Sequence, residues 1–511
     1  MLRRPPTPGI RPAAYGIRLA AYGLGIRDII RRMRPLWISG LVLGILLPRI
    51  YLIVKFQSAL IESDEAIVGL MGRHILRGEL PIFYYGQNYM GTIEPFLTAA
   101  FFAIFGATVL VLKLVPFVLL CAFVVVHYLL ASAAVNRQTA LLATALVAVS
   151  PAFLNIWSLK SRGGYMALLV LGTMALLVAA RMLNEGYSHR KAAYLGLLLG
   201  LAWWTHFLSI VYIVPILVVL LLKNERRLLS ATGMVFLGGL LFGSLPFWMY
   251  NLSHSWASLR MEGGQQTEFL SDFLNFFGTA VPIFLGARRN WGGADFFPLA
   301  GFLVLGILLG CVATLLWKWF RNVGPANLEG RHLLGLFFFF FPLLFSASGF
   351  AWFFREPRYL IPLYSVVYIL ILGAVSRRAL QIGLCLFFLA LNVTGSLLTK
   401  LEDFTGYTNV ESNEALLDYL RQHNVTRAYA PYWVAYRLTF ESGEQIICTP
   451  PEADVVRYPP YLEMVKSAQT VAYIRLNAPR YEGLHAEIKP PNDFLAERVG
   501  SYEVFLPPKP N

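Results

Sequence analysis

The chain has 511 residues, of which 57% are hydrophobic and 14% charged, and its mean hydropathy is +0.58. This composition excludes a soluble domain of ordinary size and indicates a polytopic membrane protein. The net charge of +14 is uneven, because residues 1–400 hold 33 Lys and Arg against 14 Asp and Glu, whereas residues 401–511 hold 10 against 15. A basic membrane part with an acidic tail argues against a nucleic-acid partner and for loop charges that set the membrane topology.

The first 35 residues are basic and contain eight arginines. They lack a cleavable signal followed by a small-residue site, so we expect 1–35 to be a retained cytoplasmic segment. A first membrane span is expected at 36–56, because about 20 apolar residues cross the core of a bilayer. Since loops rich in Lys and Arg stay cytoplasmic, the next loop, 57–110, is expected to face outward.

Ten further apolar stretches are predicted to be spans. They lie at about 111–133, 139–157, 166–182, 192–205, 208–222, 230–250, 297–319, 332–350, 359–375 and 380–399. The loops that this order places inside are basic, as the positive-inside rule requires. About eleven spans within 36–400 put the tail outside, which predicts a multi-pass protein of the bacterial inner membrane with a periplasmic C-terminal domain.

Two outward loops, 57–110 and 251–296, are much longer than a turn. In the first, Asp64 to Arg77 has apolar residues near helical spacing, which predicts a helix on the membrane surface. Ile93 to Phe105 is apolar but has only 13 residues. That length is too short to span, so it predicts an interfacial or re-entrant helix. Large ordered outward loops are typical of a catalyst at the membrane surface.

The tail, 401–511, changes to a mixed polar and apolar pattern. One amphipathic helix is predicted at Asn413 to Gln422. Strands are predicted at Arg427 to Ala430, Val434 to Phe440, Gln445 to Cys448, Val471 to Arg475 and Tyr502 to Leu506. About 105 residues suffice for a small core. The fold class expected is therefore a polytopic α-helical membrane protein with a small α/β domain outside the membrane.

The acidic pair Asp64 and Glu65 follows the first span on its outward side. A carboxylate at a water–lipid boundary can act as general base for a hydroxyl group, and partial burial raises its pKa toward useful values. The alternative is structural, because Ser63 or Asp64 at the start of a helix can cap its free N–H groups. Spacing alone favours neither interpretation.

Three segments resemble a known family. Ser63 to Glu65 after one span, followed by a surface helix and the run Tyr85 to Phe96, resembles the first outward loop of the C-type, lipid-linked-sugar-dependent glycosyltransferases. Within them, glycosyltransferase family 39 is the nearest group, related to protein O-mannosyltransferases and lipid A aminoarabinose transferases. The runs Arg358 to Pro362 and Tyr432 to Glu444 are also similar to segments of such proteins. The layout matches over most of the chain, although only the first-loop acid and the Arg358 run are local motifs.

This resemblance implies that Asp64 is the base, or orients the acceptor, in an inverting transfer from a sugar phosphate to a hydroxyl group. Many relatives have a second acid between the third and fourth spans, where this chain reads Lys160 to Tyr165 without one. A metal site across those two loops is therefore doubtful, and metal dependence stays open. Glu94 stands where relatives often have a basic residue. It is either a second catalytic acid or a polar anchor of the interfacial helix, and we favour the first.

Cations at the outward ends of spans are candidates for binding the phosphate of a lipid carrier, because Arg makes bidentate phosphate contacts. They are Arg162, Arg355 and Arg358, the last with pairing to Glu356 or snorkelling as the alternative. His206, Tyr85 and, with the weaker claim of the acidic pair, Glu65 are candidates for substrate binding. A lone histidine is more often structural, and interfacial aromatic belts explain most tyrosines equally well.

The leading hypothesis is a membrane glycosyltransferase that moves a hexose or pentose from a polyprenyl-phosphate donor to a lipid, glycan or protein acceptor at the periplasmic face. No cofactor is required by the residues, although a divalent metal fits the chemistry. A transporter or lipid flippase is the main alternative, and it predicts charges near the bilayer midplane and paired broken helices. A non-catalytic scaffold is the third. Neither the sugar nor the acceptor can be read from the sequence.

Overall fold

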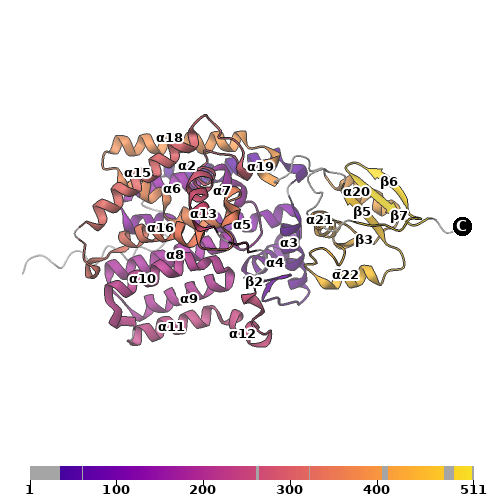
Figure 1. Ribbon diagram of the computed structural model, residues 1–511, viewed down its shortest axis with the longest axis horizontal. Coiled ribbons are helices and arrows are strands. Elements are labelled where there is room, and N and C mark those ends of the chain that lie inside the picture. The colour runs from indigo at the N-terminus through magenta and orange to yellow at the C-terminus, as the bar shows by residue number, and fades with distance from the viewer. Residues whose placement is uncertain are drawn as a thin grey trace, which may run out of the picture.

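The computed structural model describes residues 35–59, 61–228, 230–260, 264–266, 268–321, 323–405, 412–476 and 488–508. The basic segment expected at 1–35 lies almost wholly outside the described residues. The order of elements is a helical region followed by a mixed helix and strand region at the C-terminus (Figure 1).

Five helices of the described part are long and apolar enough to cross a membrane. They are α2 (Pro35–Lys55), α5 (Val109–Ala134), α8 (Tyr165–Glu185), α15 (Ala300–Phe320) and α18 (Arg378–Leu398). Each begins and ends within a few residues of a predicted span. The chain is thus a multi-pass membrane protein by the length and composition of its helices.

The other predicted spans are shorter or broken. They fall on α6 (Arg137–Ala148) with α7 (Ala152–Trp157), α9 (His189–Thr205), α10 (Ile210–Leu228), α11 (Ala231–Gly243) with α12 (Leu245–Ser253), α16 (Gly330–Ser346), and η8 (Arg358–Ser365) with α17 (Val367–Ala374). The pair α11 and α12 is bent by 61° and can count as a sixth span. Pro151 at the start of α7 and Pro246 in the first turn of α12 explain two of the breaks, because proline lacks an N–H. The count of eleven spans is therefore not confirmed.

The loop between α12 and α15 contains an apolar stretch that the sequence reading placed in a loop. Its elements are α13 (Phe269–Asn275), a π-helical turn η4 (Phe276–Ala280) and α14 (Val281–Phe284). The interior of the helical region is a large apolar cluster to which α5, α8, α16 and α17 contribute.

The first outward loop folds as predicted in its helices. It contains α3 (Ser63–Leu76), a small hairpin of β1 (Phe83–Tyr84) and β2 (Gln87–Gly91), and α4 (Ile93–Phe105). Gly78 at φ +102° follows α3 and allows the chain to reverse. The helix α4 has the bounds expected for a short apolar helix, which is too short to span.

The C-terminal region contains a five-stranded sheet in the order β4-β3-β5-β7-β6. The strands are β3 (Arg427–Tyr429), β4 (Ile447–Thr449), β5 (Ala472–Leu476), β6 (Leu495–Val499) and β7 (Tyr502–Leu506), and the helices are α19 (Leu401–Thr405), α20 (Glu414–Gln422), α21 (Tyr432–Glu441) and α22 (Pro459–Lys466). β3 pairs in parallel with β4 and β5, whereas β7 pairs antiparallel with β5 and β6. The strand predicted at Val434 to Phe440 is wrong, because these residues belong to α21.

The helix α21 lies between this sheet and α3 (Figure 1). Tyr432, Tyr436 and Phe440 recur every four residues and pack into one apolar cluster with α3. Val434, Ala435 and Leu438 face the second cluster, which covers the sheet. The tail is thereby held against the first outward loop.

Candidate active site

Asp64 lies in the first turn of α3, and its carboxylate contacts the tail. Glu62 is the N-cap residue of α3, and its side chain makes no capping hydrogen bond. Asp64 Oδ1 accepts a hydrogen bond from the Tyr432 hydroxyl, and Asp64 Oδ2 lies 3.8 Å from Arg162 Nη1. The side chain is 25% exposed. The capping alternative therefore does not describe Asp64, whose carboxylate faces other side chains instead of the backbone of its own helix.

Arg162 connects Asp64 to two further acids. Its Nη1 donates to Glu62, and its Nη2 donates to Glu356 Oε1 at 3.3 Å. Lys160 Nζ also donates to Glu62, at 2.9 Å. Burial acts to raise the pKa of the Glu62 carboxyl, but the charges of Arg162 and Lys160 outweigh it and lower the pKa to about 2. Glu62 is thus a fixed negative charge that holds both cations.

The two glycines that follow Arg162 explain how this cation reaches α3. Gly163 and Gly164 have φ values of +72° and +67°, a region that favours glycine. They reverse the chain between the Arg162 segment and the first turn of α8. Burial acts against the charged form of Arg162, but Glu62 and Glu356 raise its pKa well above the usual value. The guanidinium is therefore charged and committed to carboxylates.

Glu65 points away from Asp64 and is not open to a substrate. It is 1% exposed and forms an ion pair with Lys113 of α5. Its Oε1 also accepts a hydrogen bond from the Ser161 backbone N–H at 3.2 Å. The structure thus gives Glu65 a structural place between α3, α5 and the Arg162 segment, against the expectation that it binds substrate.

Arg358 lies at the start of η8 and is linked to the network through Glu356. Its Nη1 is 3.9 Å from Glu356 Oε2, and its guanidinium stacks 3.8 Å from the ring centre of Phe353. Among the described residues, the buried Nε of Arg358 has no hydrogen-bond partner. Arg358 therefore keeps one donor that no described residue engages.

An apolar cavity of about 150 Å³ has Tyr359, the residue after Arg358, in its wall. Tyr359 and His206 line it, together with Tyr89, Phe207, Leu208, Ile210, Val211, Phe341, Leu344, Phe345, Ser348 and Phe350. The His206 ring lies 5.0 Å from the Tyr165 ring, and its Nδ1 accepts a hydrogen bond from the Leu208 N–H. His206 is thus at the cavity wall, on the same side as Tyr359.

Glu94 belongs to the first turn of α4, and its carboxylate reaches the N-terminus of α8. It is fully buried, and its Oε1 accepts a hydrogen bond from the Ala167 N–H at 3.3 Å. Among the described residues its Oε2 has no partner. Burial raises the pKa of the Glu94 carboxyl to about 8, although backbone N–H groups of α8 lower it in part. This position makes Glu94 a cap of α8 and gives it no contact with Asp64.

Two predicted residues lie away from the Asp64 network. Tyr85 donates to Glu79 and contacts His74 Nδ1, near the far end of α3. Ten residues separate Asp64 from His74, about 15 Å along a helix. Arg355 is exposed and packs beside Gly292. The structure therefore brings together Asp64, Arg162 and Arg358, with His206 and Glu94 near them, but not Tyr85 or Arg355.

The sequence reading missed the partners of Asp64 in the tail. Arg457 Nε donates to the Tyr432 hydroxyl at 3.3 Å, and Arg457 Nη1 donates to the Gly86 carbonyl at 2.9 Å. Glu62 and Glu356, which hold Arg162, were also missed as members of the site. Tyr432 lies in a run that resembles the family and Glu356 was considered only as a partner of Arg358, but no local pattern gives these residues a role, because each acts through a contact between distant segments.

The described residues contain no group of three or more His, Cys, Asp or Glu side chains that could hold a metal ion. Glu62 and Glu65 are neutralised by Lys and Arg.

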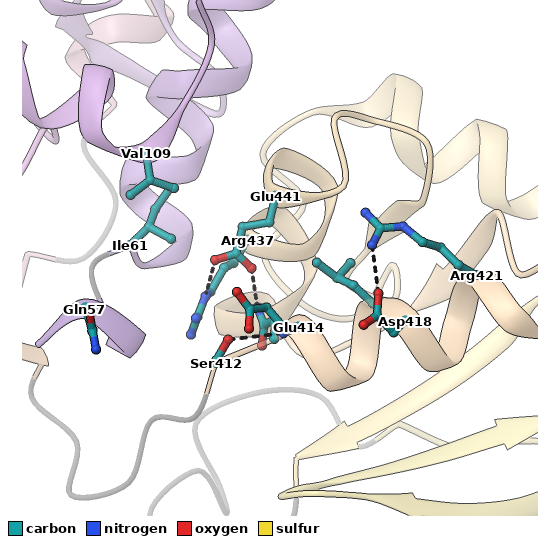
Figure 2. Close-up of a pocket in the computed structure, with 11 residues that line it drawn as sticks. Gln57, Ile61, Val109, Ser412, Glu414, Asp418, Arg421, Arg437 and Glu441 are labelled. Atoms are coloured by element: carbon teal, nitrogen blue, oxygen red, sulfur yellow. Dashed lines mark hydrogen bonds and ion pairs between the residues drawn. The ribbon is translucent and has the colours of Figure 1, made fainter.

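A second cavity of about 420 Å³ lies between the two ends of the first loop, at Gln57, Ile61 and Val109, and the tail helices α20 and α21 (Figure 2). Arg437 and Glu441 pair across one side of it, and Arg421 and Asp418 across another. None of the predicted site residues lines this cavity. It is separate from the Asp64 network.

Part of the chain matches a family defined by sequence. Residues 92–250 match the family described as dolichyl-phosphate-mannose-protein mannosyltransferase. No curated protein matches the chain in sequence.

Solved structures match over most of the chain. ArnT from Cupriavidus metallidurans in the apo state is 15% identical with a TM-score of 0.60, and the match covers 92% of this chain and 97% of that one. ArnT bound to undecaprenyl phosphate is 16% identical with a TM-score of 0.58 over the same shares. The fold of this chain is similar to that of ArnT. The resemblance that the sequence predicts is thereby confirmed at the level of the fold.

An archaeal protein has the same fold. AglB from Archaeoglobus fulgidus, an oligosaccharyltransferase in complex with an inhibitory peptide and a dolichol-phosphate, is 13% identical with a TM-score of 0.51. The match covers 86% of this chain and 69% of that one. Both C-type relatives have been seen with a polyprenyl or dolichyl phosphate.

Proposed function

We propose that this protein is an inverting glycosyltransferase of the bacterial inner membrane, which transfers a sugar from a polyprenyl-phosphate donor to a hydroxyl group of a lipid, glycan or protein at the periplasmic face. One observation carries the proposal. Asp64, a partly exposed carboxylate, is linked through Arg162 and Glu356 to Arg358, which lies beside an apolar cavity. An acid, a cation with free donors and an apolar cavity are the three groups that a lipid-phosphate sugar and its acceptor require.

The chemistry is a single displacement. Asp64 Oδ2 accepts the proton of the acceptor hydroxyl while the hydroxyl oxygen attacks the anomeric carbon of the sugar. The bond between that carbon and the phosphate oxygen breaks, and its electron pair leaves with the polyprenyl phosphate. The configuration at the carbon is inverted, and no covalent enzyme intermediate forms.

Arg358 stabilises the departing phosphate in this proposal. Its unpaired Nε and its position next to Tyr359 support that role. Arg162 donates hydrogen bonds to Glu62 and Glu356. This supports a different role for Arg162, which is to orient Asp64. We therefore assign the phosphate to Arg358 and give Arg162 and Glu94 structural roles.

The apolar cavity between His206 and Phe345 suits the isoprenoid next to the phosphate. The undecaprenyl phosphate bound to ArnT and the dolichol-phosphate bound to AglB, on the same fold, support this choice of ligand. A transporter would need a charge that is free near the bilayer midplane. Arg49 in α2 instead donates to Ser158, Ser150 and two backbone carbonyls.

The test is deletion of the gene followed by mass spectrometry of envelope lipids, glycans and glycoproteins. We expect one class of molecule to lose the mass of one sugar, and the wild-type gene but not D64N to restore it. In a second arm, purified protein is titrated with undecaprenyl phosphate. R358A should weaken its binding about tenfold to a hundredfold, which is the value of charged hydrogen bonds, and R355A should not. Full restoration by D64N, or unchanged masses after deletion, contradicts the proposal.

A further inference from the structure

The tail contacts α3 along its whole length, which fixes the register between them. At one end, Ser63 Oγ donates to the Tyr432 carbonyl at 2.6 Å. In the middle, Gly69 packs so closely on Phe440 that a Cβ there would lie 2.5 Å from its ring. At the far end, Arg77 makes two hydrogen bonds to Glu444, of 2.9 and 2.8 Å. Tyr432 therefore has a defined position over the first turn of α3.

The Tyr432 hydroxyl lies between a carboxylate and a guanidinium. It donates its proton to Asp64 Oδ1 and accepts a hydrogen bond from Arg457 Nε. Arg457 is fixed in turn by the Gly86 carbonyl and by the hydroxyl of Tyr436, which accepts from the Arg457 backbone N–H at 2.6 Å. Burial, together with the charge of Asp64, raises the pKa of Tyr432 well above its usual value. The hydroxyl thus stays a proton donor at every physiological pH.

We propose that Tyr432 and Arg457, both supplied by the tail, are positioning residues that hold Asp64 in the orientation in which it takes the acceptor proton. This inference rests on the proposed role of Asp64 as base. Tyr432 occupies Oδ1 and stops the carboxylate from rotating. Oδ2 lies 3.8 Å from Arg162 Nη1, which is beyond a hydrogen bond, so in this proposal Oδ2 is the oxygen that takes the acceptor proton. A general base that is held within a fraction of an ångström of its productive position increases the reaction rate far more than one that can rotate freely.

The alternative is that the bond between Tyr432 and Asp64 only fastens the tail to α3. The interface offers a matched control, because Tyr461 places a second buried hydroxyl at its far end. That hydroxyl contacts His74 Nε2 at 3.1 Å and Glu444 Oε1 at 3.0 Å. Y432F and Y461F each remove one hydroxyl from the same interface, and only the first touches Asp64.

The experiment compares full-length wild-type, Y432F, Y461F and D64N protein in native membranes, with the endogenous donor and acceptor as substrates. The initial rate of formation of the glycosylated product is measured from pH 5 to pH 9. We expect Y432F to lower the rate about tenfold to a hundredfold and Y461F to stay within about twofold of the wild type. Binding of undecaprenyl phosphate to purified Y432F should equal that of the wild type, which shows that the variant is folded.

The pH profile separates positioning from fastening. The charged and titratable groups that face Asp64 are Arg162, Tyr432 and Arg457, with Glu62 behind Arg162. If Tyr432 positions the reacting carboxylate, loss of its hydroxyl should move the acidic limb of the rate profile, whereas a contact that only fastens the tail should leave the limb in place.

Each outcome has one meaning. A slow Y432F with a shifted acidic limb, beside a normal Y461F, supports the inference. Equal losses in Y432F and Y461F with an unmoved limb show that the contact only fastens the tail, and a fully active Y432F beside an inactive D64N shows that Asp64 needs no such support. Both overturn the inference and leave the proposed function standing. A fully active D64N overturns both.

Discussion

Neighbouring acids of one helix have opposite environments here. Asp64 is 25% exposed and faces the tail, whereas Glu65 is 2% exposed at its side chain and bound to Lys113. Successive residues of an α-helix differ by about 100° in direction, because a turn holds 3.6 residues. A pair of acids in sequence is therefore not a pair in space. One carboxylate is available for chemistry and its neighbour holds two helices together.

The raised pKa of Glu94 allows its role to be tested. The Glu94 carboxyl has a pKa of about 8 in the folded protein and an ordinary value of 4.5 in the unfolded chain. Between these two pH values it holds a proton when the protein is folded and releases the proton when the protein unfolds. Its contribution to stability is therefore full below pH 4.5 and is lost as the pH rises to about 8, with a slope of at most about 1.4 kcal/mol per pH unit. E94Q, which stays neutral, should match the wild type at pH 5 and have a higher thermal midpoint at pH 8.5.

The exposed acid Glu79 gives the control, since E79Q should show no such difference between the two pH values. Transfer activity should survive in E94Q, because the amide oxygen still accepts from Ala167. A loss of activity comparable with that of D64N would restore the interpretation of Glu94 as a catalytic acid.

At the scale of elements, the sequence predicted short segments with a regular apolar pattern well. It did not predict the helix α21, which lies between α3 and the sheet. The bounds of α4 and β7 agree with the sequence prediction. In α21 both faces are apolar, since Tyr436 faces α3 and Val434 faces the sheet. A helix that is buried on two sides lacks the single apolar face, repeating about every 3.6 residues, by which a helix is identified in a sequence. Its apolar residues then give a pattern that is easily mistaken for that of a strand.

The ion pair between Glu65 and Lys113 joins α3 to α5 and should stabilise both. Removal of one partner from a buried pair leaves an uncompensated charge, which costs about 3–5 kcal/mol. K113M should therefore lower the free energy of unfolding by this amount in mixed micelles, and K113M/E65Q should recover most of it. K191M, which breaks the more exposed pair with Glu185, should cost less than about 1 kcal/mol. Equal costs for K113M and K191M would contradict this view.

For the whole molecule, hydropathy predicted the five long apolar helices, and the count of eleven spans is not confirmed. The regions around Pro151 and Pro246 have the composition of spans, but the helices break or bend there. The site was predictable in part. Asp64, Arg162 and Arg358 lie at the outward ends of predicted spans, where the family layout directs attention. Tyr432 and Arg457 were not predictable, because their roles depend on packing of the tail against α3.

Orientation in the membrane is a prediction at this scale. In a cysteine-free background, a cysteine at the exposed position of Glu463 in α22 should react from outside the cell with a membrane-impermeant maleimide. A cysteine at Arg190, exposed in the first turn of α9, should react only after the membrane is opened. The basic loops require this order. Labelling of Arg190→Cys in intact cells would contradict the proposal that catalysis takes place at the periplasmic face.

The hydrogen bond between Tyr432 and Asp64 joins residues that are 368 positions apart. A ribosome adds about 5–20 residues per second, so roughly 20–70 s pass between synthesis of the acid and synthesis of its partner. All the long apolar helices after α2 are made in that interval. A chain that stalls before the tail therefore carries the acid without the residue that orients it, and the membrane receives a finished active site only when insertion of the whole polypeptide is complete.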